Sequence, residues 1–277
     1  MLHMNRLPMA KRVAVVAALV EGNSIRSTVR MTGVSKNTIT KLLVDLGAAC
    51  ADYQHKALVN LPCTRVQADE IWSFVGAKDK NVPAEKKGEF GVGSVWTWTA
   101  LCADTKLMVS WLVADRSAGA AFEFMYDVAS RLRNRVQLTT DGNTAYLAAV
   151  EGAFGSDIDY AMLQKVYGVD PAGERRYSPP VCLGCKVETI QGAPDPDHVN
   201  TSYVERQNLS MRMSMRRFTR LTNAFSKKVE NHAAAVALYF MYYNFGRVHQ
   251  TIRVTPAMEA GIADHVWSIA EIVSLLD

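Results

Sequence analysis

The chain has 277 residues, of which 49% are hydrophobic and 21% charged, and 31 Lys and Arg against 27 Asp and Glu give a net charge of +4. This length buries a substantial core in one or two domains, which excludes a disordered or fibrous chain. The longest apolar runs, 13–20 and 233–240, are far shorter than the ~20 residues that cross a bilayer, so we expect no membrane partner. Five scattered cysteines suit a reducing compartment, which predicts a cytoplasmic protein.

Residues 1–47 predict three short helices that form an all-α helix-turn-helix domain. Ser24 and Ser35 are residues that cap helix N-termini, and Gly33 fits the left-handed turn after the second helix. The third helix is expected to end at Gly47. The segment has a net charge of +5, which favours DNA binding. A three-helix bundle used for packing or dimerisation has the same periodicity and stays an alternative.

In the DNA-binding interpretation, the start of the third helix enters the major groove and the second helix lies near phosphates. Short polar and basic side chains gather at that helix start, as direct reading of base edges requires. The expected DNA-binding residues of this domain are Arg26, Arg30, Lys36, Asn37, Thr38 and Lys41.

Residues 48–64 are expected to form a helical linker, after which the pattern changes to strands. Three consecutive strands followed by alternating helix and strand predict an α/β fold with a mixed sheet flanked by helices. A segment rich in Pro, Gly and charge, about 168–198, is expected to be an irregular insertion, and 251–277 a C-terminal tail. The elements expected in chain order are strands 65–75, 95–103 and 107–113, helix 118–132, strand 136–140, and helices 144–154, 201–217 and 229–245.

Three carboxylates stand out by their positions. Asp69 lies inside the first strand, where an acid is costly unless a partner compensates it. Asp141 follows the fourth strand, at the edge where sites of open α/β sheets form, and Glu205 lies in the first turns of a later helix. Each alone is an ordinary surface acid or helix N-terminal charge. Together, behind a DNA-binding module, they predict a site for a pair of divalent metal ions that acts on phosphodiesters.

A second basic segment begins at the third carboxylate. Residues 205–228 carry +6, so the 206 residues outside the two basic segments carry −7. Asn208 and Arg212 share a helix face with Glu205. A charge run is usually a solvated face, but one that begins at a candidate metal ligand favours a nucleic-acid channel. The expected DNA-binding residues here are Arg206, Asn208, Arg212, Arg216 and Arg217.

Several segments of the sequence, including those that hold the three acids, resemble a known protein family. The segments QADEIWSFVG, TTDGNTAY and SYVERQNLSMRM, which hold the three acids, resemble the three blocks of DDE transposases of the insertion-sequence one (IS-one) family, and FSKKVENH and YNFGRVHQT resemble later parts of such enzymes. The resemblance implies a ribonuclease H-like catalytic domain over 65–250. Asp69, Asp141 and Glu205 would be its catalytic and metal-ligating residues, with Arg212 as the basic residue seven positions after the glutamate.

The implied reaction is DNA strand cleavage and strand transfer by in-line attack, with two Mg²⁺ or Mn²⁺ ions. The implied partners are double-stranded DNA, as element ends and target, and further copies of the chain in a homo-oligomer. Glu230 competes for the role of third acid, and Glu70 competes with Asp69 but is expected on the opposite face of the strand. Structural zinc at Cys182 and Cys185 is not expected, because a zinc site needs four ligands.

Two alternatives remain at the level of function. One is a non-catalytic helix-turn-helix regulator whose sheet domain only dimerises. The other is a ribonuclease H-like nuclease that cleaves without strand transfer. A transposase cleaves and joins element-end DNA with Mg²⁺ or Mn²⁺, and these two activities separate the three hypotheses.

Overall fold

The computed structural model describes residues 6–168, 182–219 and 223–277. Within those ranges, no helix is long and apolar enough to cross a membrane. The strands are β1 (Arg65–Val75), β2 (Gly93–Cys102), β3 (Met108–Ala114), β4 (Val136–Thr140), β5 (Ile158–Tyr167) and β6 (Cys182–Gln191). The α-helices are α1 (Met9–Val20), α2 (Ile25–Thr32), α3 (Lys36–Ala57), α4 (Ala118–Arg131), α5 (Ala145–Phe154), α6 (Ser202–Ser214), α7 (Val229–Met241), α8 (Pro256–Glu259) and α9 (Ile269–Ser274).

The six strands form one mixed sheet in the order β3-β2-β1-β4-β5-β6. β1, β2 and β3 are antiparallel neighbours, β4 and β5 continue the sheet parallel to β1, and β6 is an antiparallel edge strand. This α/β, ribonuclease H-like mixed sheet flanked by helices confirms the predicted fold class. It places β1, with its interior acids, at the centre of the sheet.

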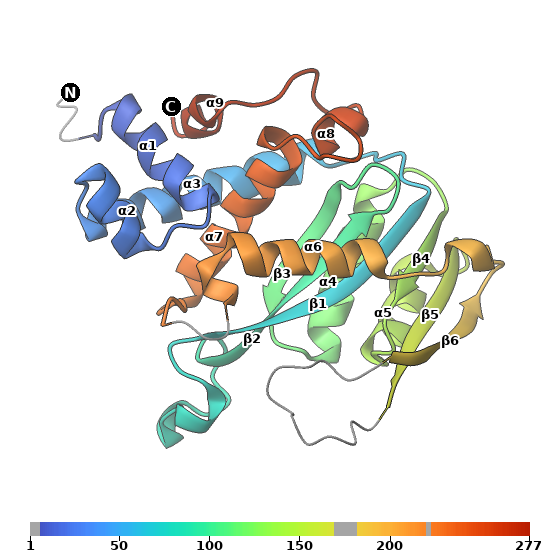
Figure 1. Ribbon diagram of the computed structural model, residues 1–277. Coiled ribbons are helices and arrows are strands. Elements are labelled where there is room, and N and C mark those ends of the chain that lie inside the picture. The colour runs from blue at the N-terminus through green and yellow to red at the C-terminus, as the bar shows by residue number, and fades with distance from the viewer. Residues whose placement is uncertain (1–5, 169–181, 220–222) are drawn as a thin grey trace.

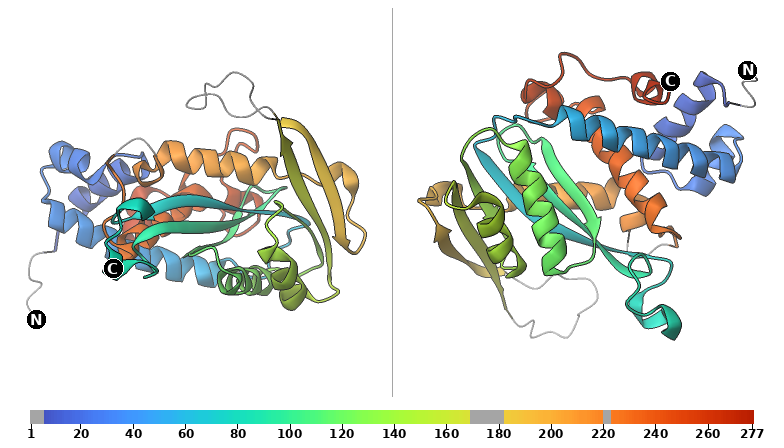
Figure 2. Two further views of the ribbon diagram at one scale, coloured as in Figure 1. Left: turned by 90° about the horizontal axis from the view of Figure 1, so that it is seen from below. Right: turned by 180° about the vertical axis from the view of Figure 1, so that it is seen from behind.

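Helices cover both faces of the sheet (Figures 1 and 2). On one face, α4 and α5 bring Phe124 and Tyr146 against the fully buried Trp98 of β2. On the other, α6 and α7 lie across the strands, and Phe240 of α7 packs on Trp111 of β3. Because side chains alternate along a strand, neighbouring residues of β1 face these two layers in turn.

The N-terminal helices begin and turn as predicted. Ser24 and Ser35 accept hydrogen bonds from the backbone N–H groups of Ser27 and Thr38, and Gly33 adopts a left-handed φ of 69°. The predicted end of the third helix is wrong, because α3 continues through Gly47 to residue 57 and so takes up most of the expected linker.

The reason α3 continues is a close helix contact. A Cβ placed on Gly47 would lie 2.5 Å from the carbonyl oxygen of Ala234 on α7. Gly47 therefore serves close packing of α3 on α7, and its helical flanks hold it in the helix despite its low intrinsic propensity.

The three N-terminal helices and the sheet share one core. A continuous cluster of buried apolar residues runs from Val15 on α1, through the sheet, to Val273 on α9. The C-terminal tail returns to α1, where the Arg12 guanidinium lies 3.1 Å from the carboxylate of Asp277. The helices and the turn of the predicted helix-turn-helix are present, but they do not bury a separate core. Their use as a DNA-binding domain remains a proposal.

The predicted insertion is ordered where the structure describes it. Residues 182–191 form β6, and β5 was not predicted at all; residues 169–181 lie outside the described ranges. β6 is exposed along most of its length, so its sequence carries no alternation between buried and exposed residues from which a strand is recognised. The prediction of irregular structure is therefore wrong for residues 182–191.

Candidate active site

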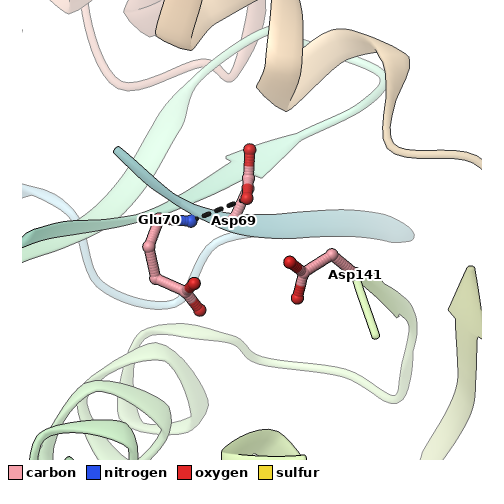
Figure 3. A group of neighbouring side chains, drawn as sticks. All are labelled: Asp69, Glu70 and Asp141. Atoms are coloured by element: carbon pink, nitrogen blue, oxygen red, sulfur yellow. Dashed lines mark hydrogen bonds between the residues drawn. The ribbon is translucent and has the colours of Figure 1, made fainter. Parts of the chain in front are cut away.

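The sheet brings Asp69, Glu70 and Asp141 together. β4 pairs with β1 only as far as Thr140 beside Ala68, so the chain leaves β4 where Asp69 follows on β1. One carboxylate oxygen of each acid lies within 4.8 Å of those of the other two. Figure 3 shows Asp69 and Glu70 extending from opposite sides of β1 while Asp141 approaches from the β4 end.

Asp69 is held by α6. Its Oδ2 accepts a 2.8 Å hydrogen bond from the amide of Asn208, and its Oδ1 accepts one from the backbone N–H of Glu70. Burial, followed by the charges of Asp141 and Glu70, raises the pKa of Asp69 to about 7. The carboxylate is thus fixed in orientation but short of positive charge, which is the condition that a bound cation relieves.

Glu70 faces the α4–α5 layer, as expected, but this does not separate it from the cluster. Its side chain is 1% exposed, and its Oε1 accepts from the amide of Asn143 while Arg116 forms an ion pair with Oε2 at 3.1 Å. Burial raises its pKa, with the hydroxyl of Tyr146 and the two donors acting in the opposite direction. Alternation predicted the face, but it did not predict that the end of β4 opens a gap that both acids reach.

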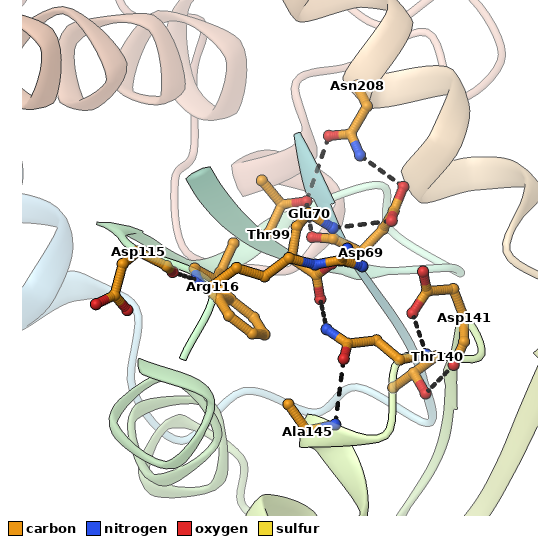
Figure 4. A network of polar contacts seen from close by, with 11 residues as sticks. Asp69, Glu70, Thr99, Asp115, Arg116, Thr140, Asp141, Ala145 and Asn208 are labelled. Carbon is orange, nitrogen blue, oxygen red and sulfur yellow. Dashed lines mark hydrogen bonds and ion pairs between the residues drawn. The ribbon is translucent and has the colours of Figure 1, made fainter. Parts of the chain in front are cut away.

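The loop after β4 is fixed by its own polar groups (Figure 4). The Oδ1 of Asp141 accepts from the backbone N–H of Asn143, which ties the turn to the acid that precedes it. The hydroxyl of Thr140 lies 2.9 Å from that of Tyr160 on β5. Because Asn143 also donates to Glu70, the loop and the central strand are linked across the gap.

Glu205 lines the same cleft but is not part of the three-acid cluster. A cleft of about 590 Å³ is lined by Asp69, Asp141 and Glu205 together. The Oε1 of Glu205 accepts from the hydroxyl of Thr201 at 2.5 Å, and its Oε2 is ion-paired with Lys165 of β5. The structure thus gathers all three predicted acids at one cleft, and the buried Glu70 lies close behind Asp69 and Asp141 in the three-acid cluster. Glu230 lies away from it, at the start of α7.

The cleft fits a hard divalent cation. Its central acids offer only carboxylate oxygens, the ligands that Mg²⁺ and Mn²⁺ prefer. Among the residues that the structure describes, neither Asp69 nor Asp141 has a Lys or Arg partner, so their charges oppose each other. Asp69, Asp141 and one flanking acid are the residues that would hold the ion.

The basic residues predicted on and after α6 divide into two groups. Arg206 and Arg216 are exposed. Asn208 is buried and its amide contacts Asp69 and Thr99, so it positions an acid, and its predicted contact with DNA stays a prediction.

Arg212 and Arg217 are half-buried. Burial lowers the pKa of Arg217 to about 10, and its guanidinium donates to Ser226 inside the fold. This internal contact occupies part of the guanidinium, and the DNA-binding role of Arg217 stays a prediction. Arg212 lies at the C-terminal end of α6, where its carbonyl oxygen accepts from Thr219.

The predicted N-terminal DNA-binding side chains are all exposed. They are Arg26, Arg30, Lys36, Asn37, Thr38 and Lys41. Lys41 forms an ion pair with Asp45 one turn later, at 2.6 Å. The surface they form at the start of α3 is accessible to a duplex, and its use for DNA stays a prediction.

Several residues of the cleft were missed from the sequence. Arg116 and Asn143 hold Glu70, and Thr201 and Lys165 hold Glu205. The signal for Lys165 was the β-rich run 158–167, which was not recognised as a strand. Asn143 follows Asp141 by two residues, the spacing of an Asx turn.

The weaker sequence signals lie outside the cleft. His232 is fully buried between Ser73 and Ser226, which makes it a structural histidine. Cys182 and Cys185 are exposed on β6. A second cleft of about 470 Å³, between α3, β3 and α4, contains none of the predicted catalytic acids.

Comparisons with known proteins give distant structural matches. No protein-family model matches the chain, and no curated protein matches it. A crystal structure of the Mos1 strand transfer complex aligns over 58% of this chain and 60% of that chain, with 14% identity and a TM-score of 0.25. A cryo-EM structure of the piggyBac transposase synaptic complex with hairpin DNA aligns over 97% and 69%, with 11% identity and a TM-score of 0.39. These values are too low to transfer an activity or a partner.

Proposed function

We propose that the chain is a metal-dependent DNA transposase of the DDE type, which cleaves DNA at the ends of a mobile element and joins those ends to target DNA. The observation that carries this proposal is the acid cleft. Asp69 and Asp141 meet at the end of β4 with oxygens within 4.8 Å, and Glu205 lines the same cleft. The three blocks that resemble IS-one family transposases contribute these same three acids.

The residues of the cleft have different roles in the proposed cleavage of a phosphodiester. Asp69 and Asp141 would hold two divalent ions with Glu205, and such ions activate an attacking oxygen and stabilise a leaving one. Asn208 keeps the Asp69 carboxylate turned into the cleft. Arg116 and Lys165 line the cleft with positive charge that attracts a phosphate. Water attacks first and frees a 3′ hydroxyl, which then attacks the target strand, without a covalent enzyme intermediate.

DNA would contact the chain at two basic surfaces. One is the exposed start of α3 with Arg26 and Arg30 of α2, which we propose as the reader of the element end. The other is formed by the exposed side of α6 and the turn that follows it, where Arg206 and Arg216 would contact phosphates. A homo-oligomer that pairs two ends belongs to the same proposal.

A cleavage and joining assay tests the proposal. Labelled duplexes that carry the DNA flanking the gene on each side are incubated with the protein and Mg²⁺ or Mn²⁺. Wild type is expected to nick them and to join the cleaved ends to a plasmid target. Asp141→Ala is expected to abolish both products while duplex binding persists, and Glu151→Ala, an exposed acid of α5 outside the cleft, is expected to retain both.

The products also separate the alternatives. Cleavage that is never followed by joining would identify a nuclease without strand transfer. Binding without cleavage in either metal would identify a non-catalytic regulator, and the proposed function would then be wrong.

A further inference from the structure

The two acids that flank Asp69 and Asp141 are paired with cations, whereas Asp69 and Asp141 are not. Glu70 pairs with Arg116, and Glu205 pairs with Lys165. Asp69 and Asp141, between them, have no such partner among the described residues. Two cations thus neutralise the flanking acids Glu70 and Glu205, whereas Asp69 and Asp141 lack such a partner.

The ion pair of Glu205 keeps it out of the cluster. Both carboxylate oxygens have partners, one in the buried hydroxyl of Thr201 and the other in the ammonium of Lys165. The three-acid cluster within 4.8 Å does not include Glu205, although it lines the same cleft. To ligate an ion beside Asp69 and Asp141, Glu205 has to give up Lys165.

The two ion pairs, Glu70–Arg116 and Glu205–Lys165, differ in how easily they separate. The side chain of Glu70 is 1% exposed and is also held by Asn143, so this acid is fixed in place although its partner Arg116 is 43% exposed. The side chains of Lys165 and Glu205 are 31% and 39% exposed, and such half-exposed ion pairs contribute little net stability. A lysine ammonium is a mobile point charge that also binds phosphate oxygens. Lys165 is therefore the cation of this cleft whose departure frees an acid that can itself move, because Glu205 is half-exposed whereas Glu70 is buried.

We infer that Lys165 holds Glu205 away from the metal-binding acids and transfers its ammonium to a phosphodiester oxygen when DNA enters, which releases Glu205 to the metal site. This inference rests on the proposed function. It makes Lys165 a positioning residue for Glu205 in the free protein and a phosphate contact in the DNA complex. The arrangement couples completion of the metal site to the presence of substrate.

Metal binding without DNA tests the first part of the inference, that Lys165 holds Glu205 away from the metal-binding acids. Mn²⁺ is titrated into metal-free protein and free Mn²⁺ is measured by electron paramagnetic resonance. Lys165→Ala is expected to bind Mn²⁺ about two- to fivefold more tightly than wild type, because Glu205 no longer leaves an ion pair. The gain is expected to vanish in the Glu205→Gln background, which separates release of Glu205 from a general loss of positive charge. Lys186→Ala removes a neighbouring charge on β6 and is the matched control.

DNA binding tests the second half. Affinity for a fluorescent duplex is measured in Ca²⁺ over a range of salt concentrations. Lys165→Ala is expected to lower the slope of log affinity against log salt by about one phosphate contact, and Lys56→Ala on α3 to leave it unchanged.

The outcomes distinguish this inference from the proposed function. Unchanged or weaker Mn²⁺ binding by Lys165→Ala, a gain that persists with Glu205→Gln, or an unchanged salt slope would overturn the inference while the metal site stands. Absence of Mn²⁺ binding by wild type would overturn the metal site itself, and the inference with it.

Discussion

Replacing Asp69 by asparagine should stabilise the metal-free protein while it abolishes activity. Folding raises the pKa of this carboxyl from 3.8 to about 7. The native state therefore binds the proton more tightly than the unfolded chain. This contribution to stability is complete below the unfolded pKa and is lost as pH rises towards 7. At neutral pH the ionised Asp69 carboxylate destabilises the fold, and the proposed metal binding requires this charge.

The size of the effect follows from the same shift. A shift of the Asp69 pKa from 3.8 to about 7 means that ionised Asp69 destabilises the fold by about 4 kcal/mol at pH above 7 and by about 2 kcal/mol at pH 5. Asp69→Asn removes this cost, but its single side-chain oxygen cannot accept from both Asn208 and the backbone N–H of Glu70, which offsets about 1 kcal/mol. We expect a net gain of about 3 kcal/mol at pH 8, on the order of 5–10 °C in Tm.

Calorimetry in EDTA at pH 8 and pH 5 measures this gain. It is expected to be largest at pH 8 and to shrink when Mg²⁺ is added, because the ion stabilises wild type alone. Glu151→Gln, an exposed acid outside the cleft, should change Tm at neither pH. A variant no more stable than wild type at pH 8, or a gain that does not depend on pH, would refute the reasoning about charge at the centre of the cleft.

Two further predictions concern packing and DNA. Gly47→Ala should lower the free energy of unfolding by about 1–3 kcal/mol in urea titrations, because the new methyl group clashes with the backbone of Ala234 and pushes α3 away from α7. Gly184→Ala is the control and should leave the free energy of unfolding unchanged, because a Cβ there has no atom within 4 Å. Equal effects of the two substitutions would contradict the close contact of α3 with α7. Lys36→Ala should weaken duplex binding and lower its salt slope by about one, whereas Lys56→Ala should not, and an unchanged slope would remove Lys36 from the interface.

Sequence patterns predicted those parts of the fold in which strand-forming or capping residues are distinctive. β1 and β4 have the predicted bounds because both segments are rich in β-branched or aromatic residues, and the caps at Ser24 and Ser35 were recognised from side chains that compete for backbone N–H groups. β6 was missed because an exposed edge strand has no buried face to reveal its period. The third helix was ended too early because a glycine that serves close packing has the same local signature as one that ends a helix.

The candidate site was predictable in its acids and not in their partners. Asp69 and Asp141 could be chosen from one strand interior and one strand end, and the sheet brings them together. The contact of Asn208 with Asp69 could not be predicted, because helix periodicity gave its face without showing that this face packs on β1. The burial of Arg217 could not be predicted either, since a charge count does not distinguish a buried guanidinium from an exposed one. Lys165 depends on tertiary structure, through a strand that was not recognised.

We propose that Asp69 and Asp141 bind the metal that carries out phosphodiester chemistry. Iron-mediated cleavage of the protein backbone tests this proposal most directly. Fe²⁺ replaces Mg²⁺ in the presence of ascorbate and peroxide, and the sites of chain cleavage are mapped by mass spectrometry. Cuts are expected beside residues 69–70 and 141–142, suppressed by excess Mg²⁺ and absent in Asp141→Ala. Cuts elsewhere alone, or cuts that persist in Asp141→Ala, would contradict it.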